Sequence, residues 1–215
     1  MRKNVVYMLV LLISMTAWAD DALVIADFSS AVGGRSVPAG WELKEKSGKA
    51  DISFVKDGDV SAALLKSEAT SFSLQKEVKV DLRQYPVLTW KWKTTKLPAK
   101  GDFRKSSTDD QAGQIFLAFS KTRAIVYIWD TTAPQGMIGD AAAPFFMKIK
   151  AVVVRSGPAD MGRWITETRN VYEDYKKIFG EEPDRPVSGI RIQINSQHTG
   201  TSAECYVADV MFKKQ

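Results

Sequence analysis

The densest run of side chains that could bind or react spans residues 104–110, Arg-Lys-Ser-Ser-Thr-Asp-Asp, directly ahead of an apolar segment. Arg104 can hold an anion or a hydroxyl group, and the carboxylates of Asp109 and Asp110 can accept hydrogen bonds from sugar hydroxyls. Loops beside strands carry binding residues more often than the strands themselves do. This run is therefore our first candidate for a ligand site.

A second polar cluster surrounds the start of an expected helix. Its members are Glu167, Arg169, Asn170 and Asp174. Arg169 can bridge to the carboxylates of the first cluster as a structural ion pair, or it can contact a ligand, and both interpretations stay open. We expect residues 104–110 and 164–174 to lie side by side at one end of the domain, with Asp110 within side-chain reach of Arg169.

Tryptophans at strand ends are candidate stacking surfaces for this site. Trp129 ends an alternating segment, and Trp164 follows a Gly-Arg pair at a loop edge. An indole ring in such a place can stack on the apolar face of a sugar, or it can cover the end of the core. Trp90 and Trp92 share one face of an alternating segment, which predicts that both are core residues.

Catalytic motifs are scarce in this chain. With one histidine, His198, and one cysteine, Cys205, there is little material for a catalytic triad or a histidine-based metal site. The remaining enzymatic route is a carboxylate pair for glycoside hydrolysis, with residues 109–110 and the pair Glu167 and Asp174 as candidates. We assign no catalytic residue, and a glycoside hydrolase is the third of our three functional hypotheses.

A structural calcium ion is the one cofactor that the sequence allows us to consider. Asp27 closes the first expected strand, and Asp209 lies in the last one. Carboxylates at strand edges, joined by loop carbonyls, would suit a hard cation such as Ca²⁺. Each aspartate could instead pair with a surface lysine.

Period-two alternation of apolar and polar residues dominates the chain and predicts strands. The expected strands are residues 22–28, 51–55, 61–66, 72–78, 88–92, 114–119, 125–129, 145–154, 190–194 and 203–212. Around ten short strands separated by turn residues predict an all-β, antiparallel β-sandwich of the jelly-roll type. Cys205 falls on the apolar face of the last strand, so we expect a buried, inert thiol.

One segment has helical periodicity instead. Val171, Tyr175 and Ile178 lie at positions i, i+4 and i+7 and form one apolar face. Asn170 is a good N-cap, and Gly180 suits the position after the last turn. The sequence therefore predicts one short helix that packs against the flank of the sandwich.

The first nineteen residues have the pattern of a secretory signal peptide. Arg2 and Lys3 precede an apolar run from Val5 to Ile13, and residues 17–19 form a small-x-small cleavage site. The apolar run is far shorter than the roughly 20 residues that cross a bilayer. We expect a signal peptide at 1–19, a single domain at 20–215 with no membrane span, and a periplasmic or secreted protein.

The charge of the expected mature chain is mild. Removal of Arg2 and Lys3 lowers the formal net charge from +5 to +3, and no dense basic stripe remains, so nucleic acid is not an expected partner. The leading hypothesis is an exported, non-catalytic binding module for a carbohydrate or another small polar ligand. The alternative is an envelope structural or assembly protein whose exposed aromatic residues contact another protein.

Several segments together resemble the bacterial domain-of-unknown-function family 3047. They lie between Tyr85 and Pro183, and include Asp-Asp ahead of a strand, the run IVYIWD, and the pattern Arg-Asn-Val…Asp-Tyr…Phe-Gly. The tail through Asp209 is similar too. The resemblance implies a β-sandwich like those of galactose-binding and carbohydrate-binding modules, and it implies no activity. It carries over to Asp109, Asp110, Arg169, Asn170 and Asp174.

Two positions depart from the pattern of that family. Where the family typically has an arginine early in the strand after Asp-Asp-x-Ala, this chain has Gly113-Gln114. The family's acidic Asp-Thr-Asp-Asn-Thr loop is Asn195-Ser196-Gln197-His198-Thr199 here, so two acidic positions are amides. If that loop binds a ligand in relatives, this chain has an altered site.

Overall fold

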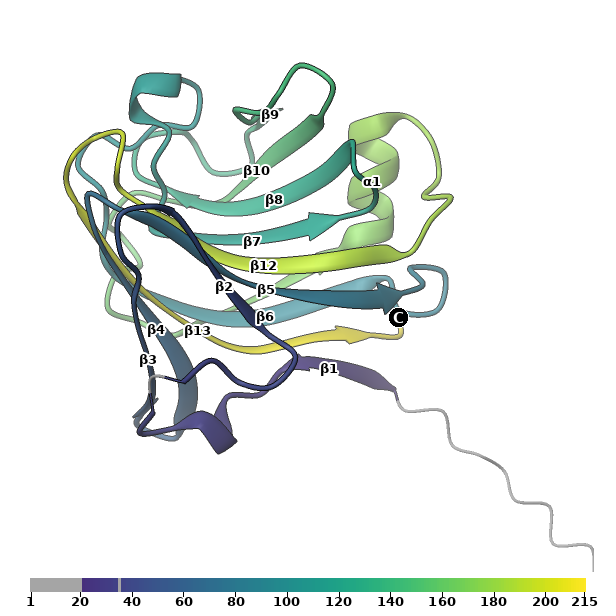
Figure 1. The fold of residues 1–215 in the computed structure, drawn as a ribbon. Coiled ribbons are helices and arrows are strands. Elements are labelled where there is room, and N and C mark those ends of the chain that lie inside the picture. The colour runs from purple at the N-terminus through teal and green to yellow at the C-terminus, as the bar shows by residue number, and fades with distance from the viewer. Residues whose placement is uncertain (1–20, 35) are drawn as a thin grey trace, which may run out of the picture.

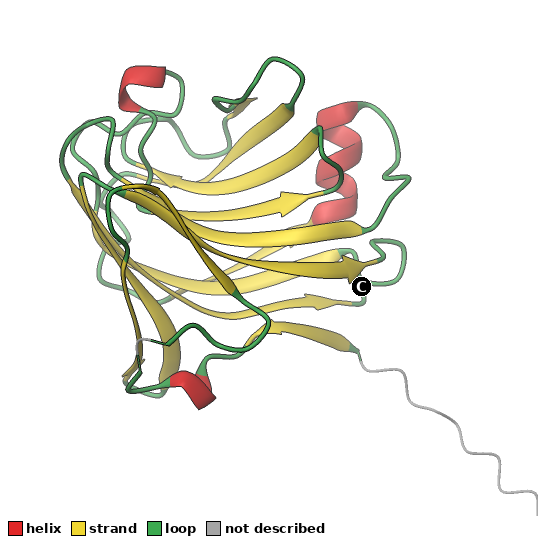
Figure 2. Ribbon diagram, in the orientation of Figure 1, coloured by secondary structure: helices red, strands yellow, loops and turns green. Residues whose placement is uncertain are grey.

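Two β-sheets packed face to face make up this protein, with one α-helix at one end (Figures 1 and 2). The computed structural model describes residues 21–34 and 36–215, so the expected signal peptide lies outside the described residues. The predicted all-β jelly-roll sandwich with a short flanking helix is confirmed. Within the described residues, no helix is both long and apolar enough to cross a membrane.

The six-stranded sheet has the strand order β11-β6-β13-β4-β3, and β1 pairs with β13 beside this path. Its strands are β1 (Ala22–Ala26), β3 (Asp51–Asp57), β4 (Val60–Glu68), β6 (Val87–Lys96), β11 (Ile165–Asn170) and β13 (Ser202–Lys213). All of its pairs are antiparallel. The long strand β13 contacts β1, β4 and β6 and is the centre of this sheet.

The seven-stranded sheet has the order β2-β5-β12-β7-β8-β10-β9. Its strands are β2 (Glu42–Ser47), β5 (Ser71–Val80), β7 (Gly113–Ala118), β8 (Arg123–Asp130), β9 (Ile138–Asp140), β10 (Lys148–Ser156) and β12 (Val187–Asn195). The pair β8–β10 is parallel, unlike the predicted antiparallel arrangement. A parallel pair needs a long connection, and residues 131–147 provide it.

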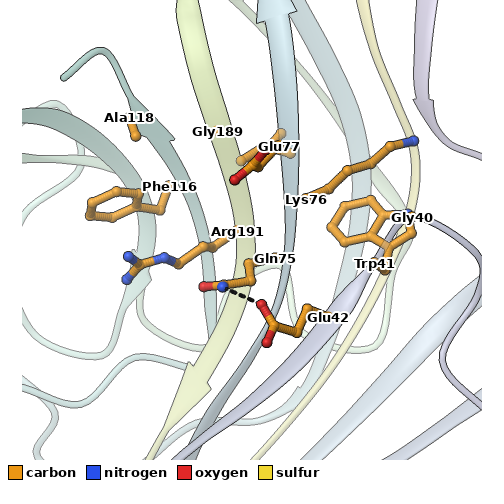
Figure 3. A pocket seen from close by; sticks show the side chains of 11 residues that line it. Gly40, Trp41, Glu42, Gln75, Lys76, Glu77, Phe116, Ala118, Gly189 and Arg191 are labelled. Carbon is orange, nitrogen blue, oxygen red and sulfur yellow. Dashed lines mark hydrogen bonds between the residues drawn. The ribbon is translucent and has the colours of Figure 1, made fainter. Parts of the chain in front are cut away.

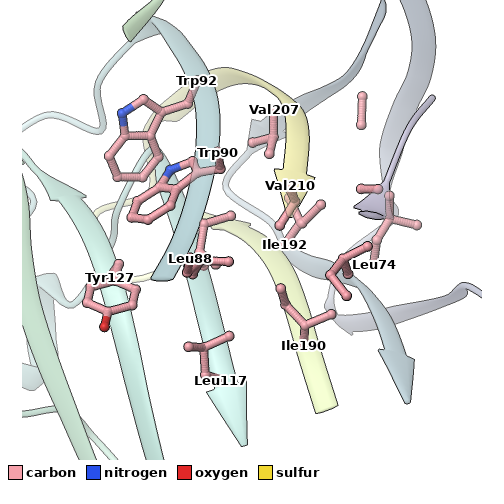
Figure 4. Close-up of a cluster of buried hydrophobic side chains, with 14 of the residues drawn as sticks. Leu74, Leu88, Trp90, Trp92, Leu117, Tyr127, Ile190, Ile192, Val207 and Val210 are labelled. Carbon is pink, nitrogen blue, oxygen red and sulfur yellow. The ribbon is translucent and has the colours of Figure 1, made fainter. Parts of the chain in front are cut away.

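The core between the sheets is built around aromatic side chains (Figure 4). Trp90 and Trp92 are fully buried and pack edge to face with ring centroids 5.4 Å apart, as predicted for core residues. Tyr127 of β8 stacks on Trp90 at 5.5 Å and so joins the two sheets. Trp129 is also fully buried, because it shares the inward parity of Tyr127. The expectation that Trp129 offers a stacking surface is wrong.

The helix α1 (Val171–Phe179) forms where the sequence predicts it. The side chain of Asn170 accepts a hydrogen bond from the Glu173 N–H at 3.0 Å and caps the N-terminus. Gly180 adopts the left-handed conformation after the last turn, with φ 75°, and its N–H bonds to the Lys176 carbonyl. Val171 and Tyr175 are buried against the sandwich.

The strands β2, β9 and β11 were not predicted from the sequence. In β2, five of the six residues are exposed, so no apolar alternation marks it. The expected strand from Phe145 begins only at Lys148. Phe145 and Phe146 lie instead in an exposed loop, with relative exposures of 100% and 58%.

The thiol of Cys205 should be unreactive in the folded protein. It is buried beside the Thr94 hydroxyl, and burial raises its pKa to about 12, so the nucleophilic thiolate is almost absent at pH 8. We expect no reaction with Ellman's reagent at pH 8 in the native state and stoichiometric reaction in guanidinium. Rapid labelling of the native protein would contradict this burial.

Candidate functional site

The outer face of the seven-stranded sheet carries a row of side chains brought together by strand register. Arg191 of β12 lies beside Gln75 of β5 on one side and beside Phe116 of β7 on the other. In the next row along the strands, Gln193 lies beside Gln114. Cross-strand neighbours of this kind have Cβ atoms about 5 Å apart. A polar strip therefore runs along β12, next to an aromatic ring on β7.

Three adjoining hollows follow this strip, and together we call them the groove. The largest, about 490 Å³, lies between Trp41, Glu77 and Arg191 (Figure 3). A second, about 280 Å³, is lined by Gln193 and by residues of the loop before β10, and a third, about 230 Å³, lies beside Lys46. Arg191 lines all three hollows, so they form one continuous surface with Arg191 at its centre.

The Arg191 guanidinium packs over the ring of Phe116, with its central carbon 4.7 Å from the ring centroid. Phe116 is buried, whereas Arg191 is exposed. Neighbouring protein atoms displace water from Arg191 and so lower its pKa. Because the pKa of an arginine is ordinarily far above neutral pH, the side chain stays a cation. The guanidinium lies beside Phe116 and has no carboxylate within ion-pair distance among the described residues (Figure 3).

Asn195 holds the wall of the groove in place. Its side-chain oxygen accepts hydrogen bonds from the Gln111 N–H at 2.9 Å and from Gln114 Nε2 at 2.6 Å. Its amide nitrogen donates to the Asp109 carbonyl at 2.7 Å. Two of the amides that depart from the family's pattern, Gln114 and Asn195, thus bond each other. They fix residues 109–111 to the end of β12.

The two adjacent aspartates of the first predicted cluster have different roles. Asp109 lines the second hollow and accepts from Gln111 Nε2 at 2.8 Å, and its partial burial raises its pKa. Asp110 is fully buried and accepts from the backbone N–H groups of His198 and Thr199, the latter at 2.6 Å. Asp109 therefore faces the groove, and Asp110 anchors the loop after β12.

The other charged residues of the predicted site are bound to protein partners outside the groove. Arg104 forms a two-pronged ion pair with Asp102, with Nε 2.6 Å from Oδ1. Arg169 pairs in the same way with Asp174, which also accepts the Tyr127 hydroxyl at 2.7 Å. The contacts of Asp174 join the helix to the core. Arg169 thus forms a structural ion pair, but with Asp174 of the helix and not with the carboxylates of residues 109–110 as we expected.

The expected approach of Asp110 to Arg169 is wrong. Asp110 accepts a hydrogen bond from the Thr199 N–H, just before the start of β13. Arg169 of β11 lies opposite Leu88 of β6 in the sheet register, and Leu88 lies opposite Phe212, near the end of β13. At about 3.3 Å per residue along that strand, the two sites are about 30 Å apart. Figure 1 shows the short 3-10 helix η2 (Ser106–Thr108) and α1 at opposite ends of the sandwich.

The tryptophans of the predicted site also lie away from the groove. Trp164 flanks the six-stranded sheet, where its indole N–H donates to Asp57 at 2.6 Å and its ring packs edge-on against Tyr206. Trp129 is inside the core and donates to the Gly157 carbonyl at 3.1 Å.

The proposed calcium ligands each have a local partner. Asp27 accepts the Ser29 N–H at 2.9 Å, and Asp209 pairs with Lys91 at 2.9 Å. Within residues 21–34 and 36–215, no three His, Cys, Asp or Glu side chains come together in a way that could hold a metal ion. Calcium at Asp27 and Asp209 stays a prediction.

A family profile matches most of the chain. The family described as "Protein of unknown function (DUF3047)" matches residues 39–211, a span that includes every groove residue named above. The chain belongs to this family. The predicted resemblance is thus confirmed, and the DUF3047 match extends beyond the segments that carried it. No curated protein sequence matches the chain.

Solved structures with similar folds include proteins that act on or bind polysaccharides. The xyloglucanase domain of NopAA, a type three effector from Sinorhizobium fredii solved in complex with cellobiose, has a TM-score of 0.51 and 7% identity, over 84% of this chain and 96% of that one. The family 11 carbohydrate-binding module of Lic26A-Cel5E from Clostridium thermocellum has a TM-score of 0.49 and 9% identity, over 92% and 96%. At such low identity, the xyloglucanase domain shows a shared fold and nothing more about this DUF3047 protein.

Sequence analysis missed the centre of the groove. Arg191 and Gln193 alternate with isoleucines, a pattern that predicts a strand and gives neither residue a function. The signal that distinguishes Arg191 is its cross-strand neighbour, Phe116, which lies 75 residues earlier in the chain.

Replacement of Asp110 should destabilise the fold. In Asp110→Ala, the backbone N–H groups of His198 and Thr199 lose their buried acceptor, so we expect the free energy of unfolding in urea to fall by about 1–3 kcal/mol. The control Asp109→Asn keeps an acceptor for Gln111 at a half-exposed site. It should change the free energy of unfolding by less than about 0.5 kcal/mol. Equal losses of unfolding free energy in the two variants would contradict the assignment of Asp110 as the anchor of the loop and of Asp109 as a groove residue.

Proposed function

We propose that this protein is a non-catalytic binding module that holds a carbohydrate in the groove. The observation that carries the proposal is Arg191, exposed at the centre of the three hollows, stacked on Phe116 and flanked by the amides of Gln75 and Gln193. Saccharide sites combine apolar surface with a few convergent donors and acceptors. The groove offers both.

The extent of the groove favours a chain of sugars over a single one. Its lining residues come from β2, β5, β12 and β7, which are neighbours in the sheet. Adjacent strands are about 4.8 Å apart, so this span alone is about 14 Å long. That length exceeds one sugar ring, and we propose an oligosaccharide or a segment of polysaccharide.

The loop before β10 adds an aromatic edge to the groove. Pro144 and Met147 line the second hollow, and between them Phe145 and Phe146 are the exposed aromatic pair. Apolar side chains this exposed often mark a binding surface. We propose that Phe145 and Phe146 stack on the ligand and define the lip of the groove.

Two further observations favour binding over hydrolysis. Glu167, a candidate catalytic carboxylate, accepts from the Trp92 indole at 3.0 Å and from Arg155 Nε at 2.6 Å. Its proposed partner Asp174 is held by Tyr127 and Arg169. Both carboxylates thus have structural partners. The xyloglucanase domain with this fold was solved with cellobiose, which supports the sandwich as a saccharide-binding scaffold and does not distinguish binding from hydrolysis.

The phenylalanine lip should matter for binding and not for stability. Phe145→Ala with Phe146→Ala should weaken binding to a glycan selected on an array by about 2 kcal/mol, or about thirtyfold. Since both rings are exposed, the free energy of unfolding should change by less than about 0.5 kcal/mol. Val24→Ala, an exposed apolar residue on β1 of the other sheet, is the matched control and should leave binding unchanged.

An assembly role predicts a different outcome. If the exposed phenylalanines contact an envelope protein, the double variant loses that protein in a pull-down from envelope extract, and no glycan on the array binds the wild type. That result would replace the carbohydrate proposal.

We propose that binding takes place outside the cytoplasm, in the periplasm or after secretion. The proposal rests on the signal-peptide pattern of residues 1–19. Intact-mass analysis of protein recovered from the periplasm or medium should give a chain that begins at Asp20. Recovery of the full-length precursor from the cytoplasm alone would contradict it.

A further inference from the structure

We propose that the ligand is an acidic saccharide, and that a uronic-acid carboxylate binds the Arg191 guanidinium. This inference rests on the proposed function and specifies the ligand class of the same groove. It starts from the charge balance of the groove, where a cation is left without an anion.

Arg191 differs from most arginines of the described chain in having no anionic partner. The arginines with a carboxylate within 4.0 Å are Arg104, Arg123, Arg155, Arg163, Arg169 and Arg185. Among residues 21–34 and 36–215, that leaves Arg83, in an exposed turn, and Arg191, in the centre of the groove. An arginine held in a hollow without a counter-ion is arranged to receive one from a ligand.

The position of Arg191 suits a planar carboxylate. The ring of Phe116 supports the guanidinium at 4.7 Å, which leaves its N–H edge free to form two parallel hydrogen bonds. Its cross-strand neighbours are Phe116 and Gln75, neither of which is charged. Gln193, two residues along β12, can serve a neighbouring hydroxyl. The set matches a sugar ring that carries one carboxylate.

A second cation extends the positive surface. Lys46 lines the second and third hollows and makes no ion pair with any described residue. Two acids near it are otherwise engaged: Glu42 pairs with Lys44 and accepts from Gln75, and Glu45 pairs with Lys49 and accepts the Ala50 N–H. Asp109, which lines the second hollow with Lys46, accepts from Gln111 Nε2 and attracts Lys46 electrostatically without forming an ion pair. Arg191 and Lys46 together can therefore face two acidic groups along one chain.

Two acidic residues of the groove oppose this arrangement, Asp109 in the second hollow and Glu77 in the largest. Glu77 lies diagonal to Arg191 across β5 and β12, and it forms no ion pair within the described part of the chain. An anion bound to Arg191 would be repelled by Glu77. Removal of this charge should therefore strengthen the binding of an acidic ligand. A Glu77 variant should thus gain affinity for that ligand, whereas an Arg191 variant should lose it.

The test compares acidic oligosaccharides with their own neutral forms on the full folded protein. The probes are tetramers of galacturonate, glucuronate and mannuronate, each with a counterpart whose carboxyl groups are reduced to alcohols, and a sulfated neutral glucan. By calorimetry we expect at least one acidic tetramer to bind tenfold or more tightly than its reduced form, with affinity that falls as salt rises.

Variants assign that preference to Arg191. Arg191→Gln should remove the tenfold preference, so that the acidic and the reduced tetramer bind with equal affinity, and Arg191→Lys should keep the preference only in part because lysine lacks the two-pronged geometry. Glu77→Gln should raise the affinity for the acidic tetramer. Both positions are solvent-accessible sheet residues, and an unchanged urea midpoint confirms that each variant is folded.

The outcomes separate this inference from the proposed function. If reduced tetramers bind as well as acidic ones, or the sulfated glucan binds equally well, the carboxylate assignment is overturned and carbohydrate binding stands. If Arg191→Gln keeps the full preference, Arg191 is not the carboxylate site. If neither acidic nor neutral saccharides bind, both proposals are overturned.

Discussion

The side chain of Tyr127 connects the three parts of this protein. Its ring stacks on Trp90 of the opposite sheet at 5.5 Å, and its hydroxyl donates to Asp174 of the helix at 2.7 Å. Arg169 closes the arrangement by pairing with Asp174 and lying over the same ring. A buried hydroxyl and a buried carboxylate are tolerated here because each satisfies the other. The spacing of the sheets and the place of the helix both depend on this contact.

The groove exists because the outer face of the seven-stranded sheet is only partly covered. Over β8 and β10, a second apolar cluster that includes Phe103, Val126 and Ile128 fills the space beneath residues 131–147. This cover ends at Phe116 of β7, where the polar residues of β12 begin. The boundary between covered and open sheet thus places an aromatic ring directly beside an arginine, and the central contact of the groove follows from it.

Sequence patterns were sufficient where the physics is local. The caps at Asn170 and Gly180 and the strand alternation of β6 depend on neighbours within a few residues, and they were predicted correctly. Trp129 could not be placed because β8 is buried on both faces, so its apolar run does not reveal which parity points inward. Of the predicted site, Asp109 lies in the groove. Arg191 could not be found because its significance depends on register with a strand far away in the chain.

In the proposed binding mode, the contact between Arg191 and Phe116 lowers the entropy cost of binding. A free arginine side chain loses much rotational freedom when a ligand fixes it, whereas one already confined against a ring loses little. The floor of the groove is thus preorganised, and the exposed loop of Phe145 and Phe146 is the part that must become ordered. Related chains can therefore change the length and residues of that loop to suit other ligands while the sheet beneath keeps its register.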